Sequence, residues 1–85
     1  MPSSRDLLKR RVLLVLRQLD GQPMEQDILV DAVTIRFTPR PTRADVEEAV
    51  KDLEASGHVQ GTTVELQGIV YTLTAKGTAA AQSLR

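Results

Sequence analysis

The apolar residues of this chain change their spacing at Gly57, and that change limits the fold more than any other feature of the sequence. Before Gly57 they recur three and four positions apart, as on the buried face of a helix. After Gly57 they alternate with polar residues, as in a half-buried strand. Because 85 residues leave room for only one hydrophobic core, we expect a single α+β domain over residues 1–85.

Three helices are predicted before Gly57, over about residues 4–19, 23–34 and 42–56. Pro23 suits the first position of the second helix. Thr42 is expected to cap the third helix in a capping box with Asp45, and Gly57 to end it in a left-handed conformation. The expected buried faces are Leu8, Val12, Val15, Leu16 and Leu19 in the first helix, Met24, Ile28, Ala32 and Val33 with Leu29 beside them in the second, and Val46, Ala49, Val50 and Leu53 in the third.

A β-hairpin is predicted over about residues 58–73, followed by a short helix over about residues 75–84. A two-residue turn at Gln67-Gly68 would pair Val64 with Tyr71. A turn near residues 61–63 is the competing prediction. The first register places all the alternating apolar residues on one buried face, namely Val64, Leu66, Ile69, Tyr71 and Leu73.

Two phrases, ADVEEAVKDLEASGHV and IVYTLTAKGTAAA, resemble the winged helix-turn-helix superfamily, and MarR- and PadR-type bacterial regulators in particular. The matching positions are Leu53, Glu54, Gly57 and Val59 in the first phrase, and Tyr71, Leu73, Thr74 and Gly77 in the second. The resemblance covers roughly residues 5–84. It implies a winged helix, with three helices followed by a hairpin wing and a short C-terminal helix. It also implies that the third helix lies in the major groove of DNA, with the wing against the backbone or minor groove.

The charge pattern argues against that use of the third helix. The chain has 11 basic and 11 acidic residues, whereas nucleic-acid-binding domains are more often clearly basic. The third helix brings five acids, Asp45, Glu47, Glu48, Asp52 and Glu54, toward a polyanion. The expected wing tip, residues 65–69, contains no Lys or Arg.

Basic residues gather instead at the start of the third helix, where base contacts are commonly made. We therefore expect double-stranded DNA to be bound by Arg36, Arg40, Thr42, Arg43 and Lys51. Additional backbone contacts are expected from Lys9, Arg10 and Arg11. The first functional hypothesis is thus a small bacterial transcriptional regulator.

The second hypothesis is a winged-helix protein-interaction module that does not bind DNA. It would use the acidic third helix or surplus apolar residues of the first helix. Leu7 and Leu14 lie off the main stripe of that helix, so they are either buried or contacts of a homodimer.

No feature of the sequence indicates catalysis, a metal site or a cofactor. His58 is the only histidine, and its place after Gly57 suits strand entry. The chain lacks cysteine, which removes thiolate metal sites. The basic N-terminus superficially resembles a targeting peptide, but its apolar run, 12–16, is too short for a signal sequence or a membrane span. A cytoplasmic protein without a membrane partner is expected.

Overall fold

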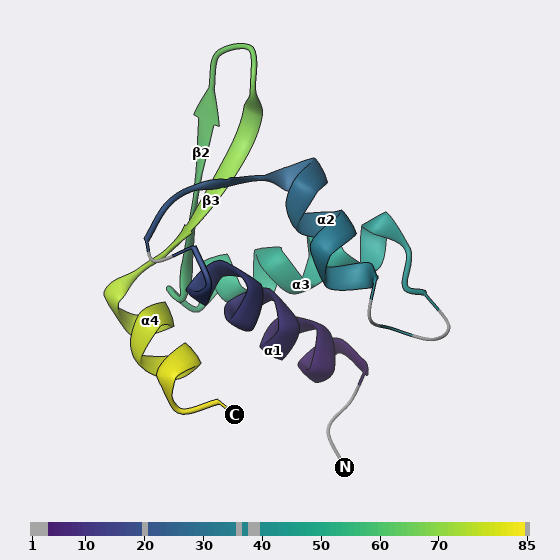
Figure 1. Ribbon diagram of the computed structural model, residues 1–85, viewed down its shortest axis with the longest axis vertical. Coiled ribbons are helices and arrows are strands. Elements are labelled where there is room, and N and C mark those ends of the chain that lie inside the picture. Colours follow the sequence, from purple (N-terminus) through teal and green to yellow (C-terminus); the bar gives the residue numbers. More distant parts are fainter. Residues whose placement is uncertain (1–3, 20, 36, 38–39, 85) are drawn as a thin grey trace.

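The computed structural model describes residues 4–19, 21–35, 37 and 40–84. Within them, four helices accompany a small antiparallel sheet of three strands, an α+β arrangement compatible with a winged helix (Figure 1). The elements follow the order α1 (Ser4–Arg17), β1 (Met24–Glu25), α2 (Gln26–Thr34), α3 (Arg43–Ala55), β2 (Val59–Val64), β3 (Gly68–Leu73) and α4 (Ala75–Gln82). No helix in these ranges has both the length and the apolar character needed to cross a membrane.

The second helix begins later than the sequence predicts. Met24 and Glu25 are extended and form β1, which pairs with Tyr71 and Val70 of β3. The prediction that the second helix starts at Pro23 is therefore wrong, because Met24 and Glu25 form hydrogen bonds with a strand that is distant in the sequence. The expected buried stripe is confirmed only in part. The helix buries Val33 and Leu29 as expected, and also Val30 and Thr34, while Ile28 is 52% exposed and Ala32 is half-buried.

The register of the hairpin also differs from the prediction. Val64 pairs with Gly68, and Tyr71 faces Gly61, so the connection is residues 65–67. Both expected turns are therefore wrong. Leu66 takes a positive φ of 70°, which closes the turn and places its side chain in solvent. The predicted apolar face is thus split: Tyr71 and Leu73 contact the core, whereas Leu66 does not.

The core lies between α1, α2 and α3, with α4 and the base of the sheet against it (Figure 1). α3 buries the four residues expected of it, Val46, Ala49, Val50 and Leu53. α1 buries Leu8, Val12 and Leu16 as predicted, and also Leu13. The branched aliphatic side chains thus supply most of this core.

The two phrases that carry the family resemblance meet at one junction. Gly57 has a φ of 83°, as predicted, and turns the chain from α3 into β2. The Thr74 amide then donates to the His58 carbonyl at 3.1 Å, and the Thr74 hydroxyl caps α4 by accepting from the Gly77 amide at 3.1 Å. A Cβ atom on Gly77 would lie 1.8 Å from the His58 carbonyl oxygen. Glycine is required there because the backbones touch.

Candidate nucleic-acid interface

The first turn of α3 is fixed by a reciprocal capping box. The Asp45 amide donates to Thr42 Oγ1 at 3.1 Å, and the Thr42 amide donates to Asp45 Oδ2 at 3.1 Å. Both bonds were expected from the sequence. The Thr42 hydroxyl accepts in this arrangement, so its own proton can still be donated to a phosphate oxygen.

Two of the acids on α3 face α1. Arg5 contacts Glu48 at 2.5 Å and Asp52 at 3.3 Å, and Lys9 lies 3.8 Å from Asp52. These pairs are partly exposed, so each contributes little to stability. Their effect is on the surface charge, because Arg5 and Lys9 of α1 compensate these two carboxylates of α3.

A second group of charges joins α3 to α2. Arg43 contacts Asp27 at 2.6 Å and Glu47 at 3.1 Å, and Gln26 donates to Glu47 at 3.2 Å. The hydrogen bonds of the Arg43 guanidinium, first to Asp27 and then to Glu47, raise the pKa of Arg43 above its ordinary value. The guanidinium predicted to bind DNA is therefore already shared between two carboxylates.

The remaining acid, near the C-terminal end of α3, bonds to the hairpin of β2 and β3, residues 59–73, which we call the wing. Glu54 accepts a hydrogen bond from the Gly61 amide of β2 at 3.2 Å. A Cβ on Gly61 would lie 2.9 Å from the Tyr71 ring and 3.0 Å from this carboxylate, so the strand approaches closely. Each of the five acids of α3 thus has a partner within the chain, namely Asp45, Glu47, Glu48, Asp52 and Glu54.

The exposed face of α3 lies among these charge pairs. Ala44, Glu48, Lys51 and Ala55 are exposed and are spaced by four, three and four positions, so they share one face, on which Glu48 is paired with Arg5. We call this surface the α3 strip. The Lys51 side chain makes no ion pair with another described residue. Arg40, exposed just before the helix, adds a second cation near its N-terminal end.

The other predicted contacts are distributed unevenly. Arg36 lies outside the described residues. Lys9 faces Asp52, and Arg10 also interacts within the chain. Arg11 is half-buried and, at about 100° per residue, leaves α1 on nearly the opposite side from Lys9. The structure therefore places Arg40, Thr42 and Arg43 at the N-terminal end of α3 and Lys51 about two turns further along the same helix. It does not bring Arg11 to them.

The apolar surface that was predicted to mediate protein contacts on α1 is small. Leu7 is 40% exposed and Leu14 is half-buried, so the pair does not form a wide apolar strip. A more exposed apolar residue, Leu66, lies at the wing tip. Sequence reasoning missed it by assuming a two-residue turn, although a three-residue turn with glycine nearby is also common in hairpins.

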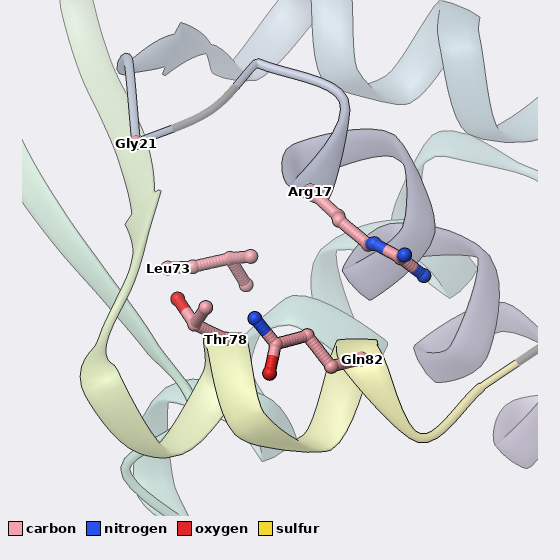
Figure 2. Close-up of a pocket in the computed structure, with 5 residues that line it drawn as sticks. All are labelled: Arg17, Gly21, Leu73, Thr78 and Gln82. Carbon is pink, nitrogen blue, oxygen red and sulfur yellow. The ribbon is translucent and has the colours of Figure 1, made fainter.

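A small pocket lies between the C-terminal end of α1, the end of β3 and α4 (Figure 2). Its lining residues are Arg17, Gly21, Leu73, Thr78 and Gln82. In Figure 2 the Arg17 guanidinium lies apart from the polar ends of Thr78 and Gln82, and it donates to the Ala81 carbonyl at 3.2 Å. The polar groups do not converge on one point, so the pocket offers no defined charged ligand site.

Comparison with known proteins informs the fold. No protein-family model matches the chain, and no curated protein matches it. Among solved structures, the chain is similar to the crystal structure of F-93 from SSV1, with a TM-score of 0.70 and 24% sequence identity. The similarity covers 89% of this chain and 80% of F-93. At this identity the likeness shows a shared fold and nothing further.

Proposed function

We propose that this chain is a winged-helix DNA-binding protein that regulates transcription, with the α3 strip entering the major groove of double-stranded DNA. One observation carries the proposal: three of the five acids on α3, Glu47, Glu48 and Asp52, form ion pairs with basic side chains of the chain. The acidic sequence of this helix therefore overstates the negative charge that it presents. The small side chains of Ala44 and Ala55 in this strip also permit close approach to a groove.

Residues of the α3 strip and of the N-terminal end of α3 have side chains that suit contacts with DNA. Lys51 can donate to guanine or to a phosphate, and Arg40 can bind either through its planar fork. Ala44 and Ala55 can contact thymine methyl groups. The free hydroxyl proton of Thr42 can reach a phosphate. Arg43 instead orients α3 against α2 through its bonds to Asp27 and Glu47.

The same observation disfavours the acidic helix as a protein-docking surface. A partner with basic groups would have to compete with Arg5, Lys9 and Arg43 for the carboxylates. Each such exchange replaces one ion pair by another, so little binding free energy is gained.

The test is a fluorescence-anisotropy titration of random duplex DNA at several salt concentrations. We expect Lys51→Ala and Arg40→Ala to weaken binding. A lost phosphate contact lowers the salt slope by about one unit, and a lost base contact costs about 1–3 kcal/mol at one sequence position. The matched control is Arg17→Ala, which removes the same charge beside the pocket. Affinity no tighter than millimolar at low salt, or equal losses in all three variants, would refute the proposal.

A further inference from the structure

The tip of the wing combines two unusual features in one residue. Leu66 is 101% exposed relative to a fully accessible leucine. It is also the one non-glycine residue with a positive φ, 70°, among those that the structure describes. Bulky L residues rarely adopt this conformation, whereas asparagine and glycine adopt it readily.

Stability therefore does not explain a leucine at this position. Asparagine or glycine would fit the backbone better and would leave no apolar side chain in water. A residue that is unfavourable in both respects is a reason to look for a binding role.

The position of the tip indicates what it can reach. The hairpin of β2 and β3 extends beyond the helices, and its tip is the farthest point of the wing (Figure 1). Its base is tied to the last turns of α3 by the bond between Glu54 and the Gly61 amide. With α3 in the major groove, as in the proposed function on which this inference rests, the wing crosses the neighbouring backbone toward the minor groove.

We propose that Leu66 is an apolar wedge that enters the minor groove and partly unstacks one base step. The turn cannot bind phosphate electrostatically, because residues 65–69 contain no Lys or Arg and Glu65 is negative. Aliphatic side chains inserted between base steps kink the duplex in this way. The neighbouring Gln67, also exposed, can donate to base acceptors in the same groove. The ligand is duplex DNA with a flexible pyrimidine–purine step, such as TA.

The experiment uses the full chain and a short duplex carrying 2-aminopurine at a central TA step, because this base fluoresces more strongly when it is unstacked. Anisotropy of a separate dye reports binding. We expect wild type to raise the 2-aminopurine signal and Leu66→Met, which keeps an apolar side chain, to retain it. Leu66→Asn should abolish the rise and weaken binding about tenfold or more, the value of one buried leucine.

The outcomes separate the wedge from the proposed function. Thermal melts should show Leu66→Asn at least as stable as wild type, since the residue is exposed and its backbone suits asparagine. Binding by wild type without a fluorescence rise overturns the wedge and leaves the proposed function standing. An equal rise with Leu66→Asn does the same. If wild type does not bind the duplex, both proposals are overturned.

Discussion

The third helix and the wing are adjacent in the chain, yet their side chains are placed in opposite ways. On α3, residues that look unfavourable in the sequence have partners: Glu48 and Asp52 meet Arg5 of α1. In the wing, a residue expected to be buried, Leu66, is fully exposed. Charge counted along a helix is therefore not the charge at its surface, and apolar alternation in a hairpin does not prove burial.

The largest effect is expected from a pair of glycine substitutions, one at the junction that follows α3 and one in the wing. Gly77→Ala in α4 places a Cβ 1.8 Å from the His58 carbonyl oxygen, at the junction between α3 and β2. Because backbone must move, we expect a loss of about 3 kcal/mol or more in unfolding free energy. Gly68→Ala meets no atom within 4 Å but must keep a φ of 83°. It should cost only about 1–2 kcal/mol. Urea denaturation measures both, and equal losses would contradict the close contact at the junction.

Leucine substitutions give the next largest effect. Leu53 of α3 is 4% exposed, so Leu53→Ala should lower the unfolding free energy by about 2–5 kcal/mol. Leu66→Ala at the wing tip should change it by less than about 0.5 kcal/mol. Chemical denaturation of the two variants under one set of conditions decides the comparison. A large loss for Leu66→Ala would mean that the wing tip packs in solution.

A smaller effect is expected where the wing meets α3. Burial, and then the charges of Glu54 and Glu47, raise the pKa of Tyr71 above its ordinary value of 10.0. Because the folded state holds this proton more tightly, the associated stability is fully present below about pH 10. It is lost as the pH rises through the folded pKa.

Tyr71 is the only tyrosine and the chain has no tryptophan, so tyrosinate absorbance reports it alone. The midpoint should be higher in the native protein than in the chain unfolded by urea, and Glu54→Gln should lower the native midpoint. Equal midpoints in the native and unfolded protein would show that the Tyr71 hydroxyl is solvated.

The two regions also show which parts of the fold could be predicted from the sequence and which could not. The bounds, cap and buried face of α3 follow from local signals, such as Thr42 with Asp45 and the spacing of Val46 and Val50. β1 does not, because Met24 is extended only through its pairing with Tyr71, far along the chain. The same holds for the site: the pairing of Arg5 with Glu48 spans 43 positions. Local patterns carry no information about such partners.

The hairpin turn was missed for a different reason. Gln67-Gly68 is a reasonable two-residue turn, and its register agreed with the apolar alternation. The observed register instead uses positive φ values at both Leu66 and Gly68. A rule that reserves this conformation for glycine and asparagine cannot predict a leucine there.

The most direct test of the central claim is an NMR titration of the ¹⁵N-labelled protein with duplex DNA at low salt. The claim is that pairing of the acids leaves the α3 strip as the DNA-binding surface. We therefore expect the largest amide shift changes at Ala44, Lys51 and Ala55, with Leu66 also affected and Ala79 of α4 unchanged. Changes confined to α1 around Leu7, or none at the strip while DNA binds, would contradict the account.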